Sequence, residues 1–488
     1  MKQKRWKTDG YLRIFASYYR PHWKLFALDM VCALCICLVD LAFPIVSRFS
    51  MQTLLPGQMF TAFFVVMAVL AGAYVLKGCF YYIITYWGHL LGVRMEADIR
   101  RDLFSHMQDL SFSFYDKNRT GQLMSRVTGD LFEITELAHH GPEDLFISSI
   151  TILGAFCVML TIRWELALIV FAVIPLFILF TTLCRKRMMR ASTEVKAKLA
   201  GINGEVESSI SGMRTAKAFA NEAAESAKFD QANDQFRGAK RGYYRAMAFY
   251  QSGMEFFMGI LSVVVIAFGG FLLMRGRMDL IDLTTFFLYI STFITPIRKL
   301  SAFVEQFMQG MAGFKRFVAL MRVEPDIQDE PDAQELTDVK GDIRVEDVTF
   351  RYEPSDPPVL EHVTLHVRPG ETVAVVGPSG GGKSTLCQLI PRFYDVTGGR
   401  VLVDGKDVRT LTQHSLRANI GIVQQDVFLF AGTIYDNIRY GRPDATEAEI
   451  VEAAKRAEIY DDILDMPDGF QTQVGERGAM LSGGQKQR

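Results

Sequence analysis

The sequence has almost no net charge and no cysteine framework. Its 488 residues carry 53 Lys and Arg against 54 Asp and Glu, a formal charge of −1. Nucleic acid is therefore excluded as the main partner, because phosphate binding needs an excess of basic side chains. Seven cysteines occur, mostly within or beside apolar runs. Cys32, Cys35 and Cys37 are too crowded for a disulfide framework and have no second ligand cluster for zinc, so they are interpreted as buried thiols.

The excess of apolar residues is concentrated before about residue 300. The chain is 49% hydrophobic and 22% charged, with a mean hydropathy of +0.14, which is high for a wholly soluble protein. Six apolar runs are long enough to cross a bilayer. The first run is followed by further apolar runs, so it is interpreted as a spanning helix and not as a signal peptide. The six expected spans lie at 24–48, 59–87, 142–162, 164–184, 250–274 and 280–302.

The distribution of basic residues predicts the topology of these spans. The tail 1–23 is rich in Lys and Arg, whereas 50–74 contains neither. The connectors 88–141 and 185–249 are basic again. By the positive-inside rule, the N-terminus and both connectors face the cytoplasm of a multi-pass protein in the plasma membrane.

The two long connectors do not have the pattern of disordered loops. Apolar residues such as Leu103, Met107 and Leu110 recur at helical spacing. We expect the spanning helices to continue into the cytosol and to turn near 114–116 and 219–222, where each turn offers a docking point for another domain. The alternative is an amphipathic segment lying in the membrane interface.

Several ionisable residues fall inside the expected spans. Asp29, Glu255 and Asp282 lie near span ends, where exposure at the interface is expected. Asp40 lies deeper and could either pair with Lys77 or line a polar cavity.

Two adjacent histidines precede the third span. His139 and His140 have no supporting cluster of carboxylates or cysteines in the sequence. They are therefore interpreted as solvated side chains and not as metal ligands.

The second half of the chain has the pattern of a soluble α/β domain. An acidic linker with prolines covers 321–341, and alternating strands and helices follow over 342–488. Strands are expected at 343–350, 363–367, 373–376, 400–403 and 420–423. A helix is expected at 446–457, opened by a capping box of Thr446 and Glu449. The fold class is thus a six-helix, all-α membrane domain over 24–320 followed by an α/β nucleotide-binding domain.

A glycine-rich stretch between an apolar run and a helix start carries the clearest chemistry. Its spacing is that of a phosphate-binding loop, whose backbone N–H groups converge on the phosphates of ATP. Lys383 can reach the terminal phosphates and Ser384 can hold Mg²⁺. The candidate ligands are Gly377, Ser379, Gly380, Gly381, Gly382, Lys383, Ser384 and Thr385.

The segment Leu481-Ser-Gly-Gly-Gln485 resembles the signature motif of ATP-binding cassette (ABC) proteins. The resemblance implies that Ser482, Gly483, Gly484 and Gln485 contact nucleotide bound to another subunit. It also implies that Tyr352 stacks on adenine, a role suited to a flat aromatic ring.

The same resemblance extends to two further motifs. Gln425 looks like the catalytic glutamine that contacts Mg²⁺ and the attacking water, with Gln424 as the competing assignment. The segment around Glu476 resembles the acidic motif of exporters, and Phe114-Tyr115-Asp116 looks like the first coupling region.

Taken over its length, the chain resembles a type I half-transporter that works as a dimer. The resemblance implies ATP-driven export by alternating access, with a homodimer preferred over a heterodimer. The partners are then a second subunit, the lipid bilayer and a hydrophobic substrate, either a lipid or a drug-like molecule. ATP and Mg²⁺ are the expected cofactors.

The chain ends at Arg488, directly after the signature. The family pattern continues into an Asp for Mg²⁺, a Glu that polarises water and a switch histidine. We therefore expect a C-terminally truncated, incompletely folded cassette that hydrolyses ATP poorly or not at all. The alternative function is a degenerate membrane subunit that binds nucleotide without hydrolysing it.

Overall fold

The computed structural model describes residues 6, 8–424, 427–475 and 481–488, which form two compact units. One unit comprises Met1–Leu110 and Asn118–Glu324, and the other comprises Ser111–Lys117 and Pro325–Arg488. The first unit is helical, with α2 (Tyr11–Ser17), α3 (Trp23–Phe49), α4 (Phe60–Ile83), α5 (His89–Asp109), α7 (Thr120–Ser125), α8 (Leu131–Ile162), α9 (Trp164–Ser211), α10 (Met213–Ala218), α11 (Glu222–Met274) and α12 (Leu280–Met321).

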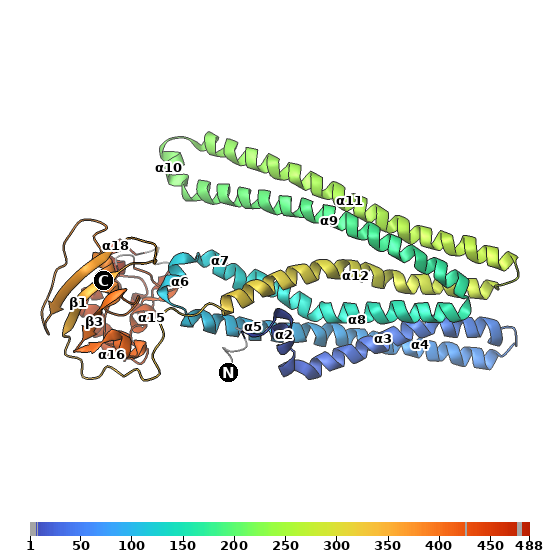
Figure 1. Ribbon diagram of the computed structural model, residues 1–488, viewed down its shortest axis with the longest axis horizontal. Coiled ribbons are helices and arrows are strands. Elements are labelled where there is room, and N and C mark those ends of the chain that lie inside the picture. Colours follow the sequence, from blue (N-terminus) through green and yellow to red (C-terminus); the bar gives the residue numbers. More distant parts are fainter. Residues whose placement is uncertain (1–5, 7, 425–426, 476–480) are drawn as a thin grey trace. The chain divides into compact units, whose positions relative to one another are not determined.

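Among the described residues, six helical segments are long and apolar enough to cross a membrane, which agrees with the predicted number of spans. Helix α9 packs along α11, and α8 packs along α12 (Figure 1). The core between them contains Val170, Phe286 and Tyr289, all fully buried. Tyr289 also donates its hydroxyl to the Leu41 carbonyl, 2.8 Å away, which satisfies the one polar atom of a ring otherwise packed among apolar groups.

Both long connectors are helical, as their apolar periodicity predicts. Helix α9 continues without interruption from Trp164 to Ser211, and α11 begins at Glu222. The short helix α10 ends at Ala218, and Ala220 has a φ of 52°, so the chain reverses where the sequence predicts a turn. In the first connector, the turn region forms the short helix α6 (Phe112–Lys117).

Three charged side chains near span ends are expected to be exposed, and two of them are buried. Glu255 is exposed and pairs with Arg298, as expected. Asp29 and Asp282, however, are only 1% and 3% exposed, so the expectation that their side chains are exposed was wrong. Asp282 is buried because Arg48 donates to it at 2.7 Å, and such pairing offsets the cost of removing a carboxylate from water.

Two further predictions on polar residues of this unit are decided by packing. Asp40 forms an ion pair with Lys77 across α3 and α4, which settles the choice in favour of pairing. His139 is only 5% exposed, so interpreting it as a solvated side chain was wrong. It points instead toward buried carboxylates from its own helix and from α3.

The second unit contains a four-stranded antiparallel sheet in the order β2-β1-β3-β4. Ile343 in β1 lies opposite Val367 in β2 and Val403 in β3, so β1 is paired on both sides. The described residues of this unit also form small helices, such as α15 and α16 (Figure 1), and a two-stranded sheet of β5 and β6. Its elements are α6, β1 (Ile343–Phe350), β2 (Leu360–Val367), α13 (Lys383–Leu389), β3 (Gly398–Val403), β4 (Lys406–Asp407), α14 (Gln413–Ala418), β5 (Gly432–Thr433), α15 (Ile434–Arg439), α16 (Glu447–Arg456), α17 (Tyr460–Leu464), β6 (Gln473–Val474) and α18 (Gly483–Gln487).

Two of the five expected strands are not formed. The segments 373–376 and 420–423 have no strand structure, and Val376 and Val423 are 87% and 77% exposed. An apolar run becomes a strand only when a neighbour supplies its hydrogen bonds and covers its side chains. Within the described residues the four-stranded sheet pairs neither segment.

The expected capping box is present at the start of α16. Thr446 and Glu449 exchange side-chain and backbone hydrogen bonds there. Donation from the Thr446 backbone N–H, followed by the Thr446 hydroxyl and Arg442, lowers the pKa of Glu449 to about 2.

Candidate functional site

The glycine-rich loop turns directly into helix α13. Gly382 is the N-cap of this helix and has a φ of 80°, a left-handed conformation that residues with a Cβ rarely adopt. A Cβ there would also lie 2.7 Å from Leu360 Cδ2 and 3.0 Å from the Val359 carbonyl. Only glycine fits this position, which keeps the loop narrow and its backbone accessible.

The polar side chains at the end of the loop lie in the first turn of α13. The Lys383 ammonium donates to the carbonyls of Gly377 and Pro378, at 3.1 and 2.8 Å, so the side chain folds back over the loop. Ser384 is exposed, whereas Thr385 is only 6% exposed. A cation and a free hydroxyl beside a glycine turn fit a nucleotide triphosphate together with its Mg²⁺ ion.

Tyr352 lies beside the helix that follows the loop. Its hydroxyl is 3.0 Å from that of Thr385, and its ring is 45% exposed. The edges of Phe350 and Tyr394 pack against it, with ring centroids 4.9 and 5.2 Å away. These contacts hold a partly open aromatic face within reach of the loop, as a base-stacking residue requires.

The second glycine motif also forms a helix start. Ser482 caps α18, accepting from the Gln485 N–H at 3.2 Å and donating its own N–H to Gln485 Oε1 at 3.0 Å. Gly483 and Gly484 are exposed, and a Cβ on either would meet no atom within 4 Å. The candidate residues Gln425 and Glu476 lie outside the described residues.

The first connector turn packs within the same compact unit as the cassette. Phe112 stacks on Phe393 with ring centroids 4.0 Å apart. Lys117 pairs with Glu353 at 2.5 Å, and this hydrogen bond raises the pKa of Lys117. The turn of the first connector is therefore held by both apolar and ionic contacts.

Asp116 provides a contact that leads back to the phosphate loop. It accepts a hydrogen bond from the Tyr394 hydroxyl. Burial, followed by this hydrogen bond, raises the pKa of Tyr394, so the hydroxyl remains a donor. Because the Tyr394 ring packs on Tyr352, whose hydroxyl meets Thr385, a continuous line of contacts joins α6 to α13.

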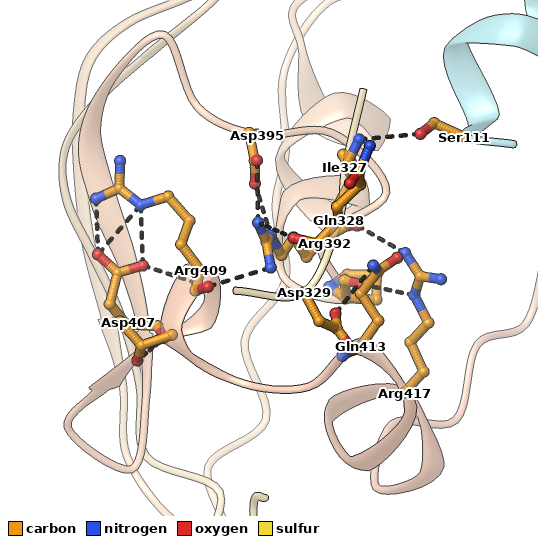
Figure 2. Close-up of polar contacts among 12 residues, drawn as sticks. Ser111, Ile327, Gln328, Asp329, Arg392, Asp395, Asp407, Arg409, Gln413 and Arg417 are labelled. Atoms are coloured by element: carbon orange, nitrogen blue, oxygen red, sulfur yellow. Dashed lines mark hydrogen bonds and ion pairs between the residues drawn. The ribbon is translucent and has the colours of Figure 1, made fainter. Parts of the chain in front are cut away.

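Arg392 fixes the backbone beneath these aromatic rings. Its side chain is 4% exposed and lies between Asp395 and the carbonyls of Arg409 and Gln328 (Figure 2). The Asp395 carboxylate is 2.8 Å from its Nε. Ser111 joins the same region, since its hydroxyl accepts from the Ile327 N–H at 3.0 Å (Figure 2).

Sequence reasoning predicted roles for the loop, Tyr352 and the coupling turn, but it did not single out Arg392, Phe393 and Tyr394. These three follow α13 closely in the chain and belong to no recognisable motif. The available signal was a pair of adjacent aromatic residues just after a short helix, and this pattern does not indicate which residues they contact.

Comparison with protein families gives two matches that together cover most of the chain. The ABC transporter transmembrane region matches residues 26–297, and the ABC transporter domain matches 360–488. The second match extends to residue 488, and these matches do not support the expectations of a truncated cassette and of lost ATP hydrolysis.

Individual relatives agree with these family matches. The chain is 44% identical to the uncharacterized ABC transporter ATP-binding protein YwjA of Bacillus subtilis, covering 98% of this chain and 83% of the relative. It is 34% identical to an ATP-dependent lipid A-core flippase of Syntrophus aciditrophicus, covering 96% and 78%. A bacterial Atm1-family ABC exporter with ATP bound has the same fold, with a TM-score of 0.82 at 24% identity over 95% of this chain and 82% of that one.

Proposed function

The chain belongs to the ABC transporter family, and from this premise we propose that it exports an amphipathic molecule across a membrane at the expense of ATP. The observation that carries the proposal is the presence of six spanning helices and a complete phosphate-binding loop in one polypeptide. Relatives named as exporters or flippases support the direction of transport.

We propose that the nucleotide site is shared between two copies of the chain. The loop residues Gly377 to Thr385 bind the phosphates, and Tyr352 stacks on the base. The segment Ser482 to Gln485 of a second copy closes over the γ-phosphate, because two exposed glycines at a helix start let an anion approach the backbone closely. Mg²⁺, when bound by Ser384 and Gln425, neutralises charge developing on the transferred phosphoryl group.

The membrane unit supports a substrate class more specific than a purely apolar molecule. A cavity of about 920 Å³ opens between α9, α11 and α12. Its walls combine Met188 and Met254 with two ion pairs, Arg185–Glu305 and Arg298–Glu255. Charged pairs beside flexible methionines suit a molecule with an apolar body and a charged head group, as lipids have. The cassette and the N-terminal tail are then cytoplasmic.

Lys383→Ala is the central test of this function. Lys383 supplies the only side-chain ammonium within the loop, and removing a charge that stabilises the phosphates should lower ATPase activity by about 100-fold or more. ATPase activity and ATP-dependent movement of a fluorescent phospholipid would be measured in proteoliposomes. The Lys406→Ala variant, at a half-buried position on β4 outside the loop, is the matched control and should keep wild-type rates. Wild-type protein that binds ATP without turnover would contradict export and favour a binding-only subunit.

A further inference from the structure

Three buried polar side chains meet inside the helical unit. Asp29 on α3 is 1% exposed, and His139 and Glu143 on α8 are 5% and 6% exposed. Asp29 Oδ1, Glu143 Oε2 and both ring nitrogens of His139 have no hydrogen-bond partner among the residues that the structure describes. Groups of this kind are rarely left unsatisfied, because each has lost its hydration without compensation. Their convergence indicates a ligand.

The separation of these atoms suits a single metal ion. One ligand atom from each of Asp29, His139 and Glu143 lies within 4.8 Å of the other two. His139 Nε2 and Glu143 Oε2, four residues apart on one helix face, are 3.8 Å apart. An ion with bonds of about 2.1 Å holds its ligand atoms roughly 3 to 4 Å apart, so small side-chain movements complete the set.

Two more histidines border the cluster. The rings of His89 and His140 each lie 4.4 Å from that of His139, measured between centroids. His89 Nδ1 is 2.6 Å from the Thr85 carbonyl and donates to it, which leaves Nε2 as the free lone pair. Metal-binding histidines are commonly oriented by such a bond through the other nitrogen.

The backbone near the cluster is arranged to admit these side chains. Gly88 ends a π-helical turn, Ile84–Gly88, that directly precedes α5. A Cβ on Gly88 would lie 2.3 Å from His139 Cε1 and 2.9 Å from Asp29 Oδ1. The third spanning segment can therefore bring its imidazole against the second only because this position is glycine.

We propose that Asp29, His139 and Glu143 bind one divalent transition-metal ion, with His89 completing the coordination. Imidazole nitrogen combined with carboxylate oxygen selects ions of the Zn²⁺ class over Ca²⁺ and Mg²⁺, which prefer oxygen alone. The ion ties α3 to α8, two spanning helices that are distant in sequence. This site is separate from the nucleotide loop and does not depend on the transport function.

Direct metal binding by the purified full-length protein tests the proposal. The protein would carry an affinity tag without histidine, be stripped with a chelator and be titrated with Co²⁺ while its visible d–d absorption is recorded. Zn²⁺ retained after dialysis would be counted by mass spectrometry. Wild type should bind one ion per chain, and Zn²⁺ should raise its melting temperature.

Variants assign the ion to the cluster. His139→Ala and the nearly isosteric Glu143→Gln should each lose the bound ion and the Zn²⁺-dependent rise in melting temperature. His22→Ala is the matched control, since His22 pairs with Asp98 at 2.9 Å and lies outside the cluster. It should bind as wild type does.

Two outcomes would overturn the proposal. One is wild-type protein that retains no Zn²⁺ and gives no Co²⁺ spectrum. The buried side chains would then hold protons and no metal ion. The other is equal binding by wild type and Glu143→Gln, which would place the ion elsewhere. The first result is measured on wild-type protein alone, so it would contradict the proposal even if a variant failed to fold.

Discussion

At the scale of single residues, glycine decides where helices and loops can approach one another. Gly382 and Gly88 have different settings, one in a phosphate loop and the other in a membrane helix. In both, a Cβ would collide with neighbouring atoms. A single glycine in a sequence does not indicate such a close approach, and only Gly382 could be recognised, from its spacing to Lys383.

Gly88→Ala should destabilise the protein although alanine normally favours helices. The added methyl group would overlap His139, and overpacking of this kind costs about 1 to 3 kcal/mol. Gly78→Ala in α4 is the control, because a Cβ there meets nothing within 4 Å. That control should be neutral or stabilising by up to about 1 kcal/mol. Thermal unfolding in detergent would measure both, and equal melting temperatures would contradict the packing argument.

At the scale of elements, the short helix α6 is held by the cassette through aromatic and polar contacts. Phe112 stacks on Phe393, and Asp116 accepts from Tyr394, which packs on Tyr352. The contact between α6 and the nucleotide-binding elements thus passes through side chains that the sequence did not single out.

Tyr394→Phe should weaken coupling while leaving nucleotide binding intact. The substitution keeps the ring that packs on Tyr352 but removes the hydrogen bond to Asp116, whose typical net value near a charged group is about 1.5 to 3 kcal/mol. Stimulation of ATPase activity by transported lipid should fall by about tenfold or more, with basal activity unchanged. Tyr440→Phe, on an exposed ring, is the matched control. Full stimulation in Tyr394→Phe would argue against this contact as a coupling element.

At the scale of the whole molecule, the proposed function requires two chains. The phosphate loop and the signature segment of one chain are each proposed to complete a site with the other chain. The amphipathic cavity between α9, α11 and α12 would then open toward a shared pathway.

A cross-link between two chains tests the shared site. Ser379→Cys and Gly483→Cys would be combined in a background where the exposed Cys387 is replaced by Ser. Oxidation should give a covalent dimer when ATP is present under non-hydrolysing conditions and little without it, since disulfides need Cα atoms within about 7 Å. Ser379→Cys alone should not cross-link through the signature. An equal yield of covalent dimer with and without ATP would contradict the proposal that the two cassettes close around the nucleotide.

The sequence by itself determined the elements that depend on local or periodic signals. Apolar length predicted six spans, helical spacing predicted the long connectors, and the spacing of glycines before Lys383 predicted the loop. Each of these properties is set by neighbours in the chain, and hydrophobic length and backbone freedom can be read directly from it.

Only the tertiary structure decided which distant side chains meet. Asp116 and Tyr394 are 278 residues apart, and Asp29 reaches His139 from another helix. The same holds for 373–376, whose apolar pattern predicts a strand that no described neighbour pairs. Burial of a charged group or pairing of a strand depends on what packs against it, and packing is a property of the assembled chain.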